Sequence, residues 1–374
     1  MKTMDKMLAW CEVGLIAKRR SAVDSRSKVN PFDENGKQRV FISPMTCLLD
    51  SKNFDEVKKS AFIPIYPVRH KNWTERINRL QMGDWVAMQS KEILDIINDS
   101  TNTPIDHNAH YRVCLDTAQG QRIDLYELTS KFKDSFPNSE IMIGNIMNPE
   151  AYIDCAKAGA DYVRCAVGTG NGCITSVNTG FHASLPWILN GIQQIKDNVI
   201  LTDDGYEYYE RDGIITIDGD EFVEEGSMVK FRTLPKVIAD GGMDESSKII
   251  KAYALGADYV MIGRLFAETV AACGELQLTA TCDESVSTHF IAEREYYGQA
   301  SEQGQIDRFG EIHSKPEGIK RTVKVKCTLE ELCQGLEKDL RSAMSYGGAF
   351  TMDEFIGQVE WREQTRAEYE SYNK

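Results

Sequence analysis

The chain alternates short apolar runs with longer amphipathic ones along most of its 374 residues. The apolar runs predict strands at 39–45, 61–68, 85–89, 111–117, 140–146, 161–168, 236–242 and 258–263. Helical apolar spacing predicts helices at 54–60, 74–82, 91–99, 122–136, 149–160, 184–197 and 245–256. Eight strands, each followed by a helix, predict an α/β fold of the (β/α)8 TIM-barrel type, with a doubly wound open sheet as the alternative.

A residue able to do chemistry follows most of these strands. The set comprises the run 69–71 (Arg-His-Lys), Asp116, Asn145, Cys173, Asp240 and Gly263. In a barrel of this type the C-terminal ends of the strands meet at one face, and the active site lies there. The placement of these residues therefore favours the barrel and predicts one shared pocket.

The loop after the sixth predicted strand, residues 168–175, reads Gly-Thr-Gly-Asn-Gly-Cys-Ile-Thr. Its alternate glycines allow a tight turn and a close approach of the backbone to a ligand. A cysteine held among free backbone N–H groups can be activated as a thiolate, which is the attacking species. Cys173 is therefore a candidate nucleophile with Thr175 beside it. The plainer alternative is an anion-binding turn with an incidental buried cysteine.

The last two predicted strands carry the clearest signal for a phosphate group. The segment 237–242 ends in Asp-Gly-Gly, the segment 259–263 ends in glycine, and a helical pattern follows each. Glycine turns that lead into helix N-termini form an anion cradle after strands seven and eight of a barrel. Asp240 would lie beside this cradle, where a carboxylate can accept hydrogen bonds from a ribose diol. Two ordinary glycine turns, with Asp240 as a helix N-cap, are the alternative.

Two segments interrupt the barrel pattern. Residues 199–231 alternate polar and apolar side chains between Asp-Gly turn signals, which predicts inserted β-hairpins before strand seven. Residues 299–320 lack a strong period and predict a mobile C-terminal flap over the barrel mouth. We expect one catalytic domain over 1–374, in which a helix at 328–346 packs back on the barrel.

The net charge and the spacing of the cysteines argue against several classes of protein. A net charge of −14 argues against binding to nucleic acid or to an anionic membrane. Ten cysteines without CxxC pairs fit reduced thiols in the cytoplasm better than a disulfide framework. No signal peptide, membrane-spanning run or calcium-loop spacing is recognised, so we expect a cytoplasmic protein and predict no divalent metal site.

Taken in order, these motifs resemble those of the IMP dehydrogenase/GMP reductase family. The loop at 168–175, the Asp-Gly-Gly at 240–242 and the strand end Val-Met-Ile-Gly at 260–263 match motifs of that family. The segment 20–27 resembles its N-terminal arm, and the segment 340–349 resembles its C-terminal helix. The resemblance covers residues 15–365, and only the hairpin insertion has no recognised counterpart.

The resemblance implies a barrel, usually a homotetramer, that acts on a purine nucleoside 5′-monophosphate with a nicotinamide cofactor. The family's thiolate attacks C2 of the purine and forms a covalent intermediate. In the dehydrogenase, hydride leaves to NAD and water hydrolyses the adduct. In the reductase, ammonia leaves first and NADPH returns a hydride. The resemblance also allows a K+ ion at the carbonyls of Gly168, Gly170 and Cys173.

Three features favour the reductase. The strands at 85–89 and 111–117 leave no room for the regulatory CBS-type domains that most dehydrogenases insert there. The Arg-Tyr pair of the dehydrogenase flap is Arg308-Phe309 here, in a short flap. The segment 68–71 resembles the reductase strand end whose lysine helps catalysis. We therefore expect an NADPH-dependent GMP reductase. The alternatives are an NAD-dependent IMP dehydrogenase with Arg308 as base, and a catalytically silent purine-nucleotide-binding protein.

The family assigns roles to residues of this chain. Cys173 would be the nucleophile, and Thr175, Glu317 and Lys71 would relay a proton to the departing amine. Asp116, Asn145 and Lys71 would contact the cofactor. The expected substrate contacts are Gly170, Asn171, Asp240, Gly241, Gly242, Gly263, Arg264, Gly298, Gln299 and Gly318. Asn171, Arg264 and Gln299 depart from the family's usual serine, glycine and methionine, so a modified or deoxy purine nucleotide is a further alternative.

Overall fold

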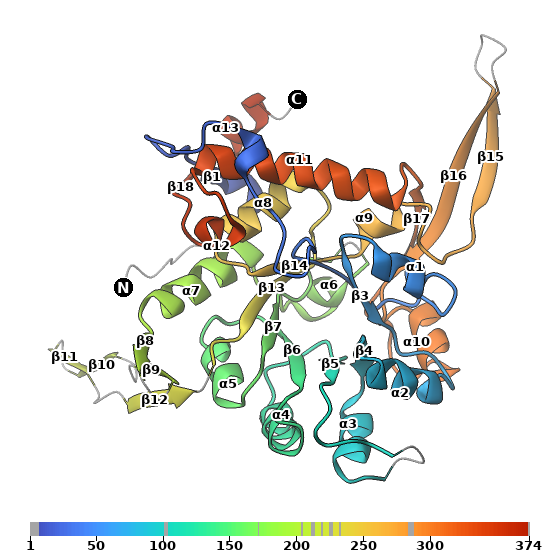
Figure 1. Cartoon of the computed structure of the whole chain (residues 1–374), viewed down its shortest axis with the longest axis horizontal. Helices are drawn as coiled ribbons and strands as arrows, with labels where there is room; N and C mark the ends of the chain where they lie inside the picture. The colour runs from blue at the N-terminus through green and yellow to red at the C-terminus, as the bar shows by residue number, and fades with distance from the viewer. Residues whose placement is uncertain are drawn as a thin grey trace.

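Figure 1 shows the computed structural model of the chain, which describes residues 7–100, 104–170, 172–202, 205–210, 214–217, 220–223, 227–231, 233–282 and 288–372. Eight parallel strands close a barrel in the order β13-β14-β2-β3-β4-β5-β6-β7. They are β2 (Val40–Ile42), β3 (Ile63–Tyr66), β4 (Trp85–Met88), β5 (Arg112–Leu115), β6 (Glu140–Ile146), β7 (Tyr162–Cys165), β13 (Lys236–Asp240) and β14 (Tyr259–Ile262). The closed order confirms the predicted barrel and excludes the open sheet.

Helices cover the outside of the barrel, as Figure 1 shows. They are α1 (Phe54–Lys59), α2 (Trp73–Gln81), α3 (Ser90–Ile97), α4 (Ile123–Ser135), α5 (Ala151–Lys157), α7 (Leu185–Asp197) and α8 (Ser246–Ala254). Each corresponds to a predicted helix. In α7 the buried residues Ile188, Leu189, Ile192 and Ile195 recur at helical spacing, so one apolar stripe faces the strands.

Aromatic side chains fill the end of the barrel at which the strands begin. Trp85, Tyr162 and Tyr259 are the first residues of β4, β7 and β14. Trp85 and Tyr162 meet edge to face with ring centroids 5.1 Å apart, and Phe41 contacts Tyr259 at 5.2 Å. Such packing closes this end with apolar and aromatic contacts. The cavity described below lies at the opposite end, where the strands finish.

The predicted hairpin insertion is confirmed in the described residues. Strands β8 (Ile200–Thr202), β9 (Gly205–Glu210) and β12 (Ser227–Phe231) form an antiparallel sheet in the order β12-β9-β8. Strands β10 (Ile214–Ile217) and β11 (Asp220–Val223) form a separate two-stranded hairpin. Figure 1 shows these strands at one side of the barrel, beyond the end of α7 and beside α5.

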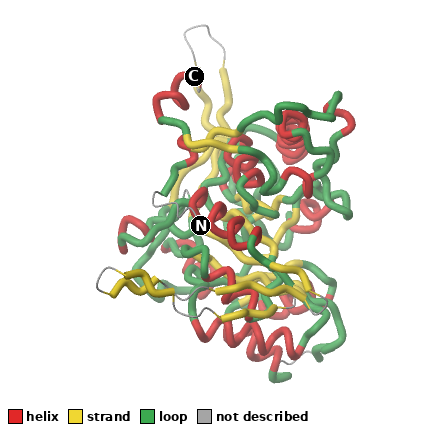
Figure 2. The backbone as a smooth tube through the Cα atoms, turned by 90° about the vertical axis from the view of Figure 1, so that its left-hand side faces the viewer, coloured by secondary structure: helices red, strands yellow, loops and turns green. Residues whose placement is uncertain are grey.

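A second antiparallel sheet follows the barrel and was not predicted. Strands β15 (Gln277–Cys282), β16 (Thr288–Tyr297) and β17 (Lys320–Lys324) pair in that order. Figures 1 and 2 both show β15 and β16 as an arm that projects from the body of the molecule. The segment 299–320, expected to lack regular structure, contains α10 (Glu302–Phe309), whose Ser301 side chain accepts a hydrogen bond from the backbone N–H of Gly304.

The C-terminal helix predicted at 328–346 is α11 (Leu329–Gly347). Thr328 and Glu331 cap its first turn reciprocally, and Leu336, Leu340 and Met344 are buried along one face. Short elements complete the chain: η1 (Trp10–Glu12), β1 (Val13–Leu15), η2 (Arg26–Lys28), α6 (Thr175–Thr179), α9 (Arg264–Ala267), α12 (Met352–Phe355), β18 (Trp361–Glu363) and α13 (Arg366–Tyr372). Strand β1 pairs with β18, which holds the two ends of the chain together.

Candidate active site

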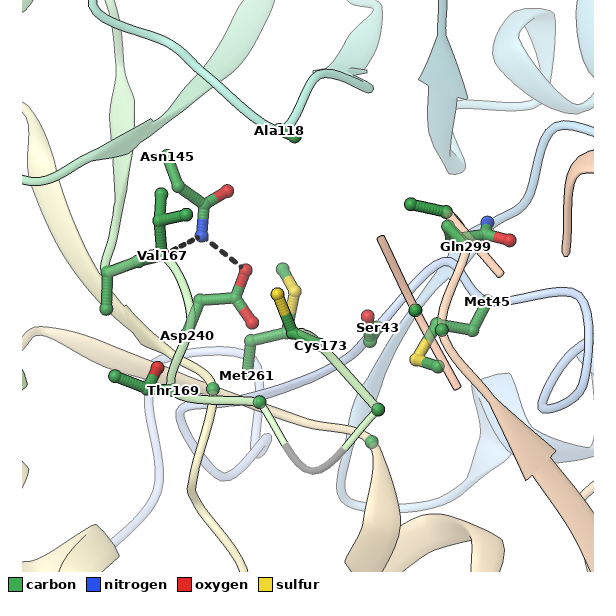
Figure 3. A pocket seen from close by; sticks show the side chains of 18 of the residues that line it. Ser43, Met45, Ala118, Asn145, Val167, Thr169, Cys173, Asp240, Met261 and Gln299 are labelled. Atoms are coloured by element: carbon green, nitrogen blue, oxygen red, sulfur yellow. Dashed lines mark hydrogen bonds between the residues drawn. The ribbon is translucent and has the colours of Figure 1, made fainter. Parts of the chain in front are cut away.

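A cavity of about 270 Å³ opens at the C-terminal ends of the barrel strands. Six of the eight strands contribute to its lining a residue from within the strand or from directly after it, namely Ser43, Asp116, Asn145, Arg164, Asp240 and Gly263. The glycine loop at 168–170, Gly298 and the flap residue Glu317 also line it. Figure 3 shows Cys173 between Asp240 on one side and Gln299 on the other.

Cys173, Thr175 and Glu317 form one chain of hydrogen bonds in this cavity. The Cys173 thiol donates to Thr175 Oγ1 at 3.3 Å, and the Thr175 hydroxyl donates to Glu317 Oε2 at 2.9 Å. Cys173 and Thr175 lie on a barrel loop, whereas Glu317 lies on the flap, 142 positions after Thr175 in the chain. A continuous path for a proton therefore runs from the thiol to a carboxylate, as a nucleophile with an adjacent base requires.

Backbone contacts hold the flap against the cysteine loop. The N–H of Ile174 donates to Glu317 O at 2.8 Å, and the N–H of Ile319 donates to Gly172 O at 3.0 Å. A Cβ atom on Gly318 would lie 2.8 Å from the backbone nitrogen of Ser301, so only glycine fits this approach without a shift. The pairing of Cys173 with Gly318 is thus what brings Glu317 to the relay.

The predicted phosphate cradle is built from glycines that line the same cavity. Gly241 and Gly242 have φ values of +98° and +72°, a backbone conformation that favours glycine. A Cβ atom on Gly241 would lie 2.5 Å from Thr169 Oγ1. Gly170 and Gly263 also line the wall. Backbone N–H groups at such turns can face an anion without a side chain between them.

Arg264 also lines the cavity, next to Gly263. Its Nε donates to Glu268 Oε1 at 3.0 Å, and its side chain is 41% exposed. Glu268 also pairs with Lys326 at 2.7 Å. The carboxylate of Glu268 therefore restrains the Arg264 guanidinium group beside Gly263 in the cavity wall.

Asp240 and Asn145 belong to a buried network at the cavity wall. Asn145 Nδ2 donates to Asp240 Oδ2 at 2.9 Å and to the carbonyl of Ala166 at 2.8 Å (Figure 3). Arg164, which sequence reasoning missed, donates to the same Asp240 oxygen from Nε at 3.1 Å and from Nη2 at 2.8 Å. An arginine inside the apolar run 161–167 was the available signal, because a buried cation needs a counter-charge.

Asp116 pairs with the flap arginine. Arg308 Nη2 of α10 lies 2.5 Å from Asp116 Oδ2, and the two side chains are only 13% and 11% exposed. Both residues were singled out from the sequence, but for different roles, since Asp116 was assigned to the cofactor and Arg308 to an alternative base. The structure brings them together as an ion pair across the cavity mouth.

Gly298 and Gln299, for which the resemblance predicts substrate contacts, both line the cavity. Gln299 lines the cavity, and its Nε2 donates to the carbonyl of Pro44. Tyr296, not predicted as a site residue, lines the same wall, and burial raises the pKa of its phenol well above the usual range. This phenol is therefore a neutral hydrogen-bonding group in the cavity.

Three predictions about the site stay predictions. Lys71 is exposed in the turn after β3 and is not part of the cavity lining, so its role in the relay stays a prediction. Asn171 lies outside the described residues. The K+ site stays a prediction too: the carbonyl of Gly170 accepts a hydrogen bond from the N–H of Cys173 at 3.0 Å. Across the described ranges, no group of three or more His, Cys, Asp or Glu side chains could hold a metal ion.

Comparison of the sequence with known proteins identifies the family to which the chain belongs. Residues 40–208 and 223–372 match the IMP dehydrogenase / GMP reductase domain. The chain belongs to this family. A GMP reductase of Streptococcus agalactiae serotype V is 27% identical over 337 residues, which are 89% of this chain and 86% of that protein. A GMP reductase of Exiguobacterium sp. is 26% identical over 368 residues, 94% of each chain.

A dehydrogenase is also similar to this member of the IMP dehydrogenase/GMP reductase family. The inosine-5′-monophosphate dehydrogenase of Chlorobaculum parvum is 31% identical over 251 residues, which are 65% of this chain but 43% of that protein. Enzymes of the family bind purine nucleotides and use NAD(P). In the part of the chain that the structure describes, no helix is long and apolar enough to cross a membrane.

Proposed function

We propose that this family member is a GMP reductase, which converts GMP, NADPH and a proton to IMP, ammonia and NADP. The observation that carries the proposal is the relay from Cys173 through Thr175 to Glu317, with Arg308 engaged elsewhere. A dehydrogenase would need a base for water. The flap offers Arg308 for that step, and its guanidinium group is paired with Asp116 at 2.5 Å.

The share of each relative that matches this chain also supports a reductase. The GMP reductases of S. agalactiae and Exiguobacterium are matched over 86% and 94% of their lengths, whereas the C. parvum dehydrogenase is matched over 43%. In this chain β4 is followed directly by α3 and β5, with no second domain in the described part of that connection. The barrel alone is thus the unit that resembles the reductases.

The residues of the relay suit the reaction at purine C2. The Cys173 sulfur would form a bond to C2 while its proton passes through Thr175 towards Glu317. Glu317 would then return a proton through Thr175 to the amino group, which leaves as ammonia. Breaking the carbon–sulfur bond after hydride transfer would release IMP and leave a thiolate, which would take up one proton from solvent to restore the Cys173 thiol. The three side chains thereby carry out nucleophilic attack and protonation of the leaving group.

The nicotinamide cofactor would supply the hydride for C2. Asn145 and the loop residues Thr117 and Ala118 line the part of the cavity where it could contact the chain. The Asp116 carboxylate is already paired with Arg308, so a cofactor contact to Asp116 would have to share or replace that ion pair. We also propose NADPH rather than NADH, and a homotetramer, as the family resemblance implies.

A paired assay tests the direction of the reaction. The protein is incubated with GMP plus NADPH and, separately, with IMP plus NAD, and the nicotinamide absorbance is followed together with ammonia release. We expect NADPH oxidation with one ammonia released per turnover in the first mixture and no reaction in the second. NAD reduction in the second mixture alone would show a dehydrogenase. No turnover in either, with nucleotide binding intact, would favour the catalytically silent binder.

A further inference from the structure

The sheet formed by β15, β16 and β17 has two edges, and they differ in charge. Strand β17 forms one edge, and three of its five residues are the exposed Lys320, Arg321 and Lys324. Charged side chains, lysine above all, keep an exposed edge strand from pairing with another chain. Strand β15 forms the other edge, and its six residues, Gln-Leu-Thr-Ala-Thr-Cys, include no charge and no proline. One edge is thus protected against pairing, whereas the other is not.

The β15 edge is also uncovered by its own chain. Throughout the part of the chain that the structure describes, β15 pairs with β16 alone. Leu278 is 68% exposed, and Leu276, directly before the strand, is 44% exposed. Gln277 and Thr279 are exposed as well. Because successive side chains of a strand point to opposite faces, neither face of this stretch is covered.

A second copy of this chain is the partner that fits an uncharged edge. The chain carries a net charge of −14, so two copies repel each other wherever their charged surfaces meet. Two β15 strands bring no charge into a contact. Identical strands related by a two-fold axis run antiparallel, and each then offers the other the same row of N–H and C=O groups. Such a contact is closed, because each copy uses its one unprotected edge.

The arm holds this edge in a position that a second copy can reach. Figures 1 and 2 show β15 and β16 projecting from the body of the molecule, so pairing at β15 would keep the two barrels apart. The base of the arm is anchored. Arg294 of β16 is 1% exposed, and its guanidinium group donates a hydrogen bond to the carbonyl of Ala272. A pre-ordered edge loses little conformational freedom on pairing.

We propose that β15 pairs antiparallel with β15 of a second copy, so that the two three-stranded sheets join into one continuous sheet. The inference goes beyond the proposed function, because the pairing requires no nucleotide and no catalytic residue. The joined sheet would connect the two active sites. In each copy β16 leads into Gly298, β17 begins shortly after Glu317, and both residues line the cavity.

Leu278→Lys tests the contact, because it gives β15 the kind of charge that protects β17. Leu278 lies at the surface, so its replacement should leave the fold intact. Sedimentation velocity of the full chain measures the mass of the particle in solution. We expect the variant to have half the wild-type mass, because two copies would bring two lysines into the contact. Equal masses would overturn the proposal, and so would a wild-type protein that is monomeric at about 100 μM.

Leu201→Lys is the matched control. Leu201 is 72% exposed and also lies in an edge strand, β8 of the inserted sheet. We expect this variant to keep the wild-type mass. A loss of mass in Leu201→Lys but not in Leu278→Lys would place the contact at the insertion and overturn the proposal.

Hydrogen–deuterium exchange locates the contact on the strand. We expect the backbone amides of β15 to exchange about tenfold more slowly in the wild-type protein than in Leu278→Lys, because pairing protects the outward N–H groups. The amides of β17, at the other edge, should exchange at the same rate in both proteins. A mass that halves while exchange in β15 stays unchanged would show that the copies meet elsewhere, and would overturn the proposal.

Discussion

Thr175→Val removes the central link of the relay while keeping the shape of the side chain. In the described residues, the Thr175 hydroxyl is the only side-chain hydrogen-bond partner of both the Cys173 thiol and the Glu317 carboxylate. Valine replaces that hydroxyl with a methyl group, so the thiol and the carboxylate both lose their side-chain partner. No other described group can carry a proton between them.

The expected loss follows from this geometry. A positioned general acid or base contributes about 100- to 10,000-fold to a rate. Since the valine variant disconnects the whole relay, we expect kcat to fall by this range, or about 3–5 kcal/mol of transition-state stabilisation. The effect on folding should be smaller, about 1 kcal/mol, because one ordinary hydrogen-bond network at a partly exposed position is lost.

Steady-state NADPH oxidation with GMP measures the change, with Thr175→Ser as the matched control. Serine keeps the hydroxyl, so its kcat should stay within about tenfold of the wild type. Glu317→Gln should lower kcat as far as Thr175→Val, and the double variant should be hardly worse, because residues that act as one unit are not additive. A valine variant with kcat close to that of the serine variant would refute the relay.

Three further outcomes are expected. Arg308→Met, which breaks the ion pair with Asp116, should speed cleavage after Phe309 in limited proteolysis with chymotrypsin, and an unchanged rate would show that the pair does not hold the flap. Arg264→Gly should raise the GMP dissociation constant about tenfold, whereas unchanged affinity would mean that the guanidinium group does not reach the phosphate. Iodoacetamide at about pH 8 should label Cys173 before Cys47. Burial raises the pKa of Cys47 to about 12, so its side chain stays a thiol until the pH approaches that value. Peptide mass spectrometry detects the labelled cysteine, and preferential labelling of Cys47 would contradict this reasoning.

The barrel could be predicted because each strand carries its own apolar run and each helix its own stripe. The segment 140–146, for example, has the bounds of β6, and the helix expected at 184–197 is α7. Such patterns record burial against a common core, which periodicity detects. Helix α10 was not predicted because its buried residues are Gly304 and Gln305, which form no apolar stripe.

The arm formed by β15 and β16 was missed for a related reason. Its strands are held by pairing with each other, and Gln277, Leu278 and Thr279 are all exposed. No alternation of buried and exposed residues therefore marks this part of β15. A hairpin held mainly by backbone hydrogen bonds leaves little trace in the hydrophobic pattern.

Site residues that are close together in the sequence could be predicted, whereas contacts between residues far apart in the sequence were missed. Cys173 and Thr175 lie within one loop, and Asp240, Gly241 and Gly242 within one strand end, so the chain itself puts them together. The partnership of Arg164 with Asp240 spans 76 positions and depends on the closure of the barrel. The relay role of Lys71 comes from the family resemblance alone, and it stays a prediction for a side chain that is exposed in the structure.

The most direct test of the central claim is the turnover of Cys173→Ala with GMP and NADPH, measured beside its affinity for GMP. If the thiol attacks purine C2, NADPH oxidation and ammonia release cease, while GMP binds within about threefold of the wild type because the glycine cradle and Asp240 are untouched. Turnover of the alanine variant at the wild-type rate would contradict covalent catalysis by Cys173.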